Sequence, residues 1–307
     1  MQAHRLPFTE DRIFKMFLVL STHVLFIYIN MVMLVIVWSK SVFRGTARYI
    51  LFAHMLFNDT LHLGIGLVLY LLGAYYLTVV RAACAFIVLL SACTFTNAPL
   101  NLAVMSLERY TAICFPLHHS ELATPRRTQV AVLLVWALGC INVITDVVTL
   151  FLAEPSFFLS PAVCTIEQLQ MKPWQRHKGV VLNVLLFITV AAVLLYTYVA
   201  IMLEARSALS DSSSARRALH TVLLHAIQLG LSLMSFLYVL LEFLLAMLPI
   251  GLYAHLRFVN FFVVLILPRC LSSLIYGVRD EAFRPIFRKH FLCGGLKKVG
   301  PGIPMKT

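Results

Sequence analysis

The residues of this sequence that could do chemistry are charged side chains within or at the ends of long apolar runs. Asp59 and Arg269 stand inside such runs, and Glu108 is adjacent to Arg109 at the end of another. A charged side chain in apolar surroundings is costly unless a partner, a proton or water compensates it. Glu108 can neutralise Arg109 in one packing of the chain and release it in another.

The sequence shows no arrangement of residues that is typical of an enzyme active site or a metal site. No set of histidine, aspartate and glutamate residues has hydrolase or zinc spacing, and the seven cysteines form no CxxC pair. His54 and His62 share one helical stripe without a third ligand, which is typical of helix packing. We therefore expect a protein that is not an enzyme and holds no metal.

The composition places this chain in a membrane. It has 307 residues, of which 61% are hydrophobic and 12% charged, with a mean hydropathy of +0.89. One water-soluble core cannot bury that much apolar surface. The net charge of +12 is concentrated near segment ends, which favours contact with anionic membrane lipid and argues against nucleic acid.

Seven apolar runs are long enough to cross the hydrocarbon layer. In lipid the backbone must satisfy its own hydrogen bonds, so these runs are expected to be helices. The prediction is an all-α, seven-transmembrane helix bundle that forms a single domain over 1–307, with a short amphipathic eighth helix over 280–292. The expected spans are 16–38, 48–72, 82–114, 129–152, 179–203, 216–248 and 254–278.

Lysine and arginine placement predicts the orientation. With the N-terminus outside, the inner segments carry fifteen of these residues and the outer segments eight. Positive residues concentrate on the cytoplasmic side of membrane proteins. We therefore expect a multi-pass plasma-membrane protein with an extracellular N-terminus and a cytoplasmic C-terminus.

The end of the third span reads MSLERYTAICFPL from Met105 to Leu117. A bare Glu-Arg pair also fits an ordinary interfacial salt bridge, but the complete stretch is more specific. It resembles the signature of odorant receptors, in the variant found in fish, and contains the Glu/Asp-Arg-Tyr triad of rhodopsin-like G-protein-coupled receptors. The resemblance extends over nearly the whole chain.

This resemblance implies a set of residues for G-protein coupling. Arg109 would contact the G protein after activation, Glu108 would restrain it, and Pro116 and Leu117 would begin the docking loop. Tyr276, at the end of the seventh span, is expected to move inward on activation, and Pro268 to kink that span. The remaining coupling candidates are Tyr110, Tyr198 as a partner of Tyr276, and His225 in the sixth span.

The resemblance also implies a disulfide and a buried polar network. Cys84 and Cys164 would form the bridge across the outer mouth. Asn58 and Asp59 stand where receptors hold a sodium ion, but Arg269 is an alternative cation for the same carboxylate. A protonated structural aspartate is a further alternative. Cys293 is a candidate for lipidation, and a free thiol is its alternative.

The implied ligand cavity opens outward between spans three, five, six and seven. Receptors for amines carry an aspartate where Ser91 stands, so a biogenic amine is not expected. His177, Lys178, Glu242 and Arg257 near the mouth would suit a small polar or charged odorant. The candidate ligand contacts are Ser91, Thr94, Phe95, Asn183, Phe187, Tyr238, Glu242, Arg257 and Asn260.

The function predicted from these observations is an odorant-activated receptor that works through a heterotrimeric G protein of the stimulatory, olfactory type. The ligand would bind the open state of the bundle better than the closed state. A rhodopsin-like receptor for a non-odorant ligand and a membrane transporter or channel are the alternatives.

Overall fold

The structure is a computed structural model. It describes residues 10–207 and 244–279, together with residues 227, 230, 231, 233, 234, 237, 238 and 240–242. Six helical segments within this part of the chain are long and apolar enough to cross a membrane. The sixth predicted span, 216–248, is described only in part, and the predicted amphipathic helix over 280–292 lies outside the described residues.

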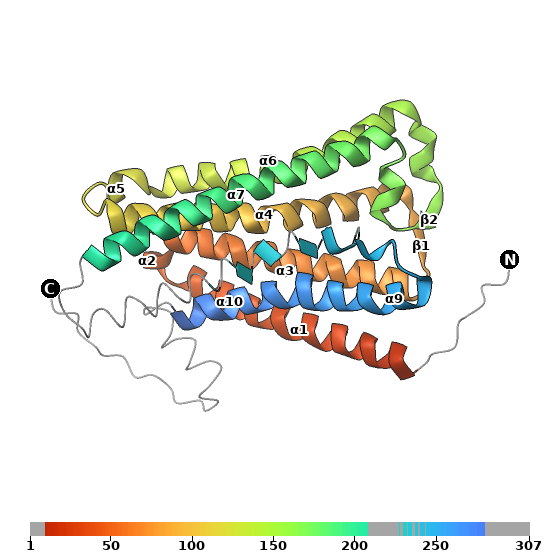
Figure 1. Ribbon diagram of the computed structural model, residues 1–307, viewed down its shortest axis with the longest axis horizontal. Coiled ribbons are helices and arrows are strands. Elements are labelled where there is room, and N and C mark those ends of the chain that lie inside the picture. Colours follow the sequence, from red (N-terminus) through yellow and green to blue (C-terminus); the bar gives the residue numbers. More distant parts are fainter. Residues whose placement is uncertain are drawn as a thin grey trace.

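The long helices run roughly side by side along the longest axis of the molecule (Figure 1). They confirm the predicted all-α bundle. The long elements are α1 (Glu10–Ser39), α3 (Ala47–Ala74), α4 (Arg81–Cys114), α6 (Pro125–Ala153), α7 (Pro173–Ser207) and a final segment made of α9 (Ile250–Val259), the π-helix η3 (Asn260–Ile266) and α10 (Leu267–Arg279).

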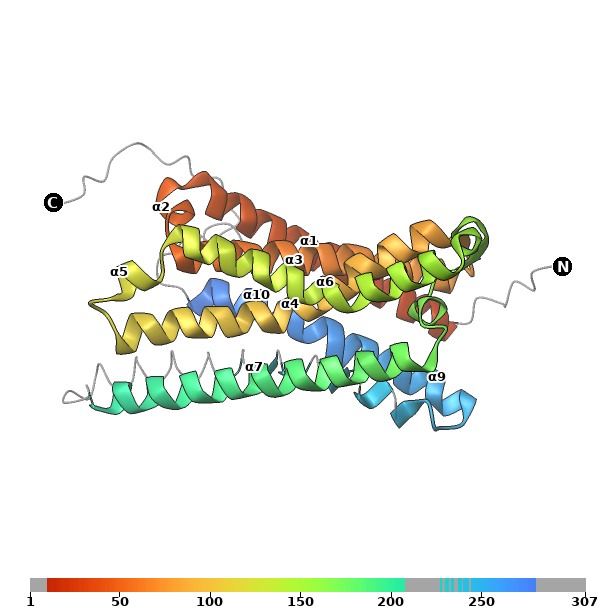
Figure 2. The same ribbon diagram turned by 90° about the horizontal axis from the view of Figure 1, so that it is seen from above.

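Short elements mark the two ends of the bundle (Figures 1 and 2). Helices α2 (Ser41–Arg44) and α5 (His119–Leu122) lie at one end. At the other end, β1 (Thr78–Val80) pairs antiparallel with β2 (Pro161–Val163), with Thr78 opposite Val163. The 3-10 helices η1 (Pro155–Leu159) and η2 (Ile166–Leu169) flank β2. Neither this small sheet nor these turns were predicted from the sequence.

Several helices begin before the apolar run that predicted them. Helix α1 begins at Glu10 and α7 at Pro173, each six residues before its predicted span. Hydropathy detects the part of a helix that needs lipid, whereas the hydrogen-bonded backbone continues into the polar boundary. At the start of α6 the Thr124 side chain accepts a hydrogen bond from the backbone N–H of Arg127 at 3.3 Å.

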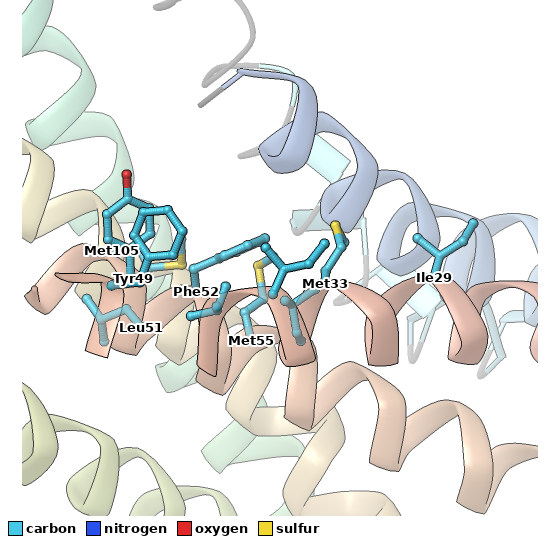
Figure 3. Packing of buried hydrophobic residues seen from close by; sticks show 11 residues of the cluster. Ile29, Met33, Tyr49, Leu51, Phe52, Met55 and Met105 are labelled. Carbon is cyan, nitrogen blue, oxygen red and sulfur yellow. The ribbon is translucent and has the colours of Figure 1, made fainter. Parts of the chain in front are cut away.

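The largest apolar cluster lies between α1, α3 and α4. Met33 of α1 and Phe52 of α3 are fully buried, and Met105 of α4 packs against the same group (Figure 3). Because lipid is as apolar as these side chains, close packing holds the helices together here. The buried members are Ile29, Met33, Ile36, Val37, Phe43, Tyr49, Leu51, Phe52, Met55, Leu56 and Met105.

Helices α4 and α6 approach closely at Gly139. A Cβ atom at this position would overlap the Asn97 side chain and lie 3.2 Å from the Cys93 carbonyl oxygen. With its amide oriented to suit these neighbours, Asn97 donates to the carbonyl oxygens of Val135 at 3.0 Å and of Cys93 at 3.1 Å. A disulfide joins Cys93 to Cys140 at the same contact, with their Cα atoms 4.7 Å apart. Sequence analysis did not predict this bridge.

The predicted bridge between Cys84 and Cys164 is present in the structure. Their Cα atoms are 5.3 Å apart, and the bond ties the segment after β2 to the start of α4. Arg81 adds to this junction, since its guanidinium lies 4.2 Å from the centre of the Phe157 ring. The sheet end of the bundle is therefore cross-linked.

We expect Cys84→Ser and Cys164→Ser to destabilise the protein equally, and the double variant to be no worse than either. A bridge with a sequence separation of 80 residues restricts the unfolded chain by about 4.5 kcal/mol in the chain-entropy model. Thermal unfolding of purified protein and surface labelling of intact cells measure the effect. Cys114→Ser, at a free cysteine, is the control, and unchanged single variants would contradict the prediction.

Candidate functional site

Glu108 has two partners at the end of α4. Its Oε2 atom lies 3.8 Å from Nε of Arg109, and its Oε1 atom lies 3.2 Å from Nε2 of His119 on α5. Arg109 is 20% exposed at its side chain, yet its Nη2 atom is buried without a hydrogen-bond partner among the described residues. The predicted Glu108–Arg109 pair thus exists, but Glu108 makes its closer contact with a histidine that sequence analysis did not select.

The same end of α4 is hydrogen-bonded to α7. The hydroxyl groups of Tyr110 and Tyr196 are 3.1 Å apart, and those of Ser106 and Thr197 are 2.5 Å apart. Tyr198, a predicted partner of Tyr276, packs against the apolar cluster between α4 and α7. These contacts hold α7 beside the Glu108–Arg109 pair.

The loop between α4 and α5 presents apolar side chains to the surroundings. Leu117 is 88% exposed and Phe115 is 46% exposed. Pro116 lies between them, outside either helix. An exposed leucine beside a charged pair suits the docking role predicted for Pro116 and Leu117.

Two predicted coupling residues and the predicted lipidation site lie outside the part of the chain whose side chains the structure describes. His225 and Cys293 lie outside the described residues, and so does the side chain of Tyr276. Their predicted roles stay predictions.

A buried ion pair joins α3 to α10 inside the bundle. Arg269 Nη1 lies 3.3 Å from Asp59 Oδ1, and the two side chains are 3% and 4% exposed. Arg269 Nη2 also donates to the carbonyl oxygen of Phe95 at 3.1 Å, on α4. Asn58 donates to the carbonyl oxygen of Thr94 at 3.0 Å. The three residues predicted as a polar network, Asn58, Asp59 and Arg269, are therefore in one place.

Thr94 belongs to this network rather than to the ligand cavity where sequence analysis placed it. It is fully buried, and its hydroxyl lies 2.9 Å from Nδ1 of His62. The same hydroxyl donates to the carbonyl oxygen of Leu90 at 2.8 Å. Residue spacing placed Thr94 on the third span, but the rotation of that helix directs its side chain towards α3.

His54 makes a second polar link, across α3, α4 and α6. Trp136 donates from Nε1 to His54 Nε2 at 2.9 Å, so Nε2 carries no proton. His54 Nδ1 then donates to Asn101 Oδ1, also at 2.9 Å. His54 and His62 serve helix packing, as their spacing indicated. Among the described residues no group of three or more histidine, cysteine, aspartate or glutamate side chains could hold a metal ion.

Five of the predicted ligand contacts come together near the sheet end. Glu242 Oε1 lies 2.6 Å from Arg257 Nε, and Asn260 Nδ2 donates to Glu242 Oε2 at 3.3 Å. Asn260 also donates to the carbonyl oxygen of Tyr238 at 3.2 Å. The rings of Tyr238 and Phe95 are 6.4 Å apart. Arg257 is 53% exposed at its side chain, so part of this pair remains accessible.

Tyr253 completes the cluster and was missed by sequence analysis. It donates from its hydroxyl to Glu242 Oε1 at 3.3 Å. Tyr253 lies four residues before Arg257 on α9, so one helical face presents both side chains to Glu242. The spacing of four residues between Tyr253 and Arg257 can be read from the sequence. That both side chains contact Glu242 cannot be read from it.

The remaining predicted contacts are on α7 and α4. Asn183 and Phe187 are on α7, where Phe187 is 38% exposed, and Ser91 is partly buried on α4. Lys178, predicted near the mouth, instead pairs with Asp146 of α6 at 2.6 Å. Lys178 therefore links two helices and is not free to meet a ligand.

Comparison with known proteins agrees with this arrangement. Residues 29–276 match the sequence profile of the family described as 7 transmembrane receptor (rhodopsin family). The chain belongs to the rhodopsin family of seven-transmembrane receptors. Membership makes it a multi-pass membrane protein of a receptor family rather than of an enzyme family.

Individual relatives of this receptor include odorant, olfactory and galanin receptors. Odorant receptor 131-2 of Danio rerio is 32% identical over 87% of this chain and 83% of its own length. Olfactory receptor 11A1 of Homo sapiens is 31% identical over 41% of this chain and 40% of its own. Galanin receptor 2a of Danio rerio is 24% identical over 65% of this chain and 55% of its own.

The residues around Asp59 in this receptor do not fit the sodium ion considered from the sequence. A hard cation needs several oxygen ligands at short range. Here Arg269 already places a positive group on the Asp59 carboxylate, and Asn58 directs its amide nitrogen to a carbonyl oxygen. A sodium ion bound to the Asp59 carboxylate would lie close to the positive guanidinium of Arg269, which would repel it.

We expect Arg269→Ala and Asp59→Ala each to lower the stability of the receptor by about 3–5 kcal/mol, because each leaves an uncompensated buried charge. Asp59→Asn combined with Arg269→Gln removes both charges and should recover part of that loss. Thermal unfolding in detergent measures the difference. If the double variant is no more stable than the single variants, the pair does not act as a unit.

Proposed function

We propose that this receptor is activated by a small odorant and activates a heterotrimeric G protein of the stimulatory, olfactory type. The observation that carries the proposal is the 32% identity with Odorant receptor 131-2 over 87% of the chain. The two charged clusters support it, since Glu242 with Arg257 lies towards one end of the bundle and Glu108 with Arg109 at the other.

The sheet end is proposed to be extracellular. The disulfide between Cys84 and Cys164 lies at that end, and disulfides persist in oxidising compartments. The segments that the sequence predicts to be inside carry fifteen lysine and arginine residues, against eight on the segments predicted to be outside, as expected for a cytoplasmic face. The Glu108–Arg109 pair then faces the G protein.

Activation is proposed to be a shift between two packings of the bundle. In the described packing Arg109 lies beside Glu108, and Tyr110 and Ser106 hold α4 to α7. A ligand that binds an open packing more tightly favours that packing by its difference in affinity. Opening releases Arg109 and exposes it, together with the loop at Leu117, to the G protein.

The odorant is proposed to meet the receptor at the Glu242–Arg257 pair. Arg257 is the more exposed member, so a polar group of the ligand reaches its guanidinium first. The Phe95 and Tyr238 rings are less exposed than Arg257 and suit the apolar part of the ligand. These contacts favour an odorant with one polar group on an apolar body.

Membrane lipid is the remaining proposed partner. A groove of about 940 Å³ between α1, α3 and α4 is lined almost entirely by apolar side chains, among them Trp38, Phe57 and Phe86. Such a surface suits the acyl chains of the surrounding bilayer.

Arg109→Ala is expected to abolish ligand-dependent signalling, because it removes the charge proposed to contact the G protein. Cyclic AMP is measured in cells that express the receptor with an olfactory-type stimulatory G protein, during exposure to odorant mixtures. Arg126→Ala, at the start of α6, is the matched control and should signal normally at equal surface expression.

Two outcomes would contradict this function. A ligand-gated current that persists in Arg109→Ala without G protein would show a channel. Activation by galanin and by none of the odorants would favour the alternative of a receptor for a non-odorant ligand, which the similarity to Galanin receptor 2a supports.

Glu242→Gln and Arg257→Ala are each expected to raise the half-maximal concentration of an active odorant by about tenfold or more, the effect of losing one hydrogen bond to a charged group. Dose–response curves at equal surface expression measure the shift. Arg176→Gln, at an exposed arginine of the same end, is the control. Equal curves for all three variants would remove this pair from the ligand site.

A further inference from the structure

The two oxygens of Glu108 are not equally engaged. The contact with His119 Nε2 is 3.2 Å, within hydrogen-bond range, whereas the contact with Arg109 Nε is 3.8 Å, beyond it. A carboxylate only accepts hydrogen bonds, so His119 donates from Nε2. Adjacent residues on a helix do not face one another, and Glu108 therefore turns more easily to the loop than to Arg109.

Arg109 is incompletely paired as a result. Its Nη2 atom is buried and has no hydrogen-bond partner among the described residues. Because the Glu108 carboxylate is drawn towards His119, the guanidinium keeps an ion pair at longer range. The restraint on Arg109 is weaker than a hydrogen-bonded pair would provide.

His119 is itself held in a defined place. It is the first residue of α5, which begins two residues after the exposed Leu117. The backbone of α5 is tied to α6, since Arg127 Nη1 donates to the carbonyl oxygen of Glu121 at 2.8 Å. The His119 side chain thus joins a short, anchored loop helix to the carboxylate that restrains Arg109.

We propose that His119 is a positioning residue for G-protein activation, which holds Glu108 away from Arg109 and so limits the strength of the resting restraint. The inference rests on the proposed function. Without the imidazole, Glu108 is free to close on Arg109, and spontaneous opening becomes rarer. Without Glu108, His119 has nothing to position.

The test is ligand-free activity, measured as GTPγS binding to a stimulatory G protein in membranes that contain equal amounts of receptor. We expect Glu108→Ala to raise this activity and His119→Ala to lower it by about tenfold, the effect of losing one hydrogen bond to a charged group. His119→Gln retains an N–H donor and should restore at least half of the loss. His118→Ala, at the neighbouring exposed histidine, should have no effect.

The double variant separates the alternatives. With Glu108 already replaced by alanine, His119→Ala should cause no further change. A fall of the same size in that background would show that His119 acts on the G protein directly and would overturn the inference. The inference is also overturned if Glu108→Ala raises the ligand-free activity and His119→Ala leaves that activity unchanged or raises it. If neither Glu108→Ala nor Arg109→Ala alters GTPγS binding, the proposed G-protein function fails, and this inference with it.

Discussion

The hydrocarbon around the helices offers no hydrogen bonds, so polar side chains within the bundle must find their partners on other helices. Arg269 meets this constraint with the carboxylate of Asp59 and a carbonyl oxygen of α4. His54 meets it between Asn101 and Trp136. Each set of contacts fixes how far one helix is rotated relative to its neighbours. Apolar packing against lipid alone would leave that rotation weakly determined.

Helix α4 is the element on which these contacts converge. Thr94 of α4 contacts His62 of α3, and Asn97 contacts Gly139 of α6. Ser106 of α4 contacts Thr197 of α7. The same helix carries Glu108 and Arg109 at one end and the bridging Cys84 at the other. A displacement of α4 or of a neighbour against it therefore changes the contacts at both ends. In the proposed two-state activation, a movement of α4 would therefore couple the sheet end of the bundle to the Glu108–Arg109 pair.

The features that sequence analysis predicted correctly depend on strong, local constraints. A run of about twenty apolar residues identifies a span, and the described residues contain helices long enough to cross a membrane at six of the seven predicted places. A charge inside a span requires a partner, which made Arg269 a candidate for Asp59 before their 3.3 Å contact was known. The bridge between Cys84 and Cys164 was implied by the family resemblance, and the structure contains it.

What sequence analysis missed depends on helix rotation and on contacts between distant segments. The Thr94 hydroxyl is bonded to His62 across the helices, whereas the ring of the adjacent Phe95 lies near the rings of both His62 and Tyr238, because one residue turns a helix by about 100°. The contact between His119 and Glu108 depends on the fold of the loop after α4. Lys178 was expected at the mouth, but its partner Asp146 lies on another helix. No spacing rule within one segment reveals these partners.

Arg269 gives the receptor a counterion that is part of its own chain. A dissolved ion occupies its site according to its concentration, so the state that it stabilises rises and falls with the surrounding salt. A covalently attached guanidinium has a local concentration set by the fold alone. The charge balance at Asp59 is then set by the fold and does not change with the salt concentration of the surrounding water.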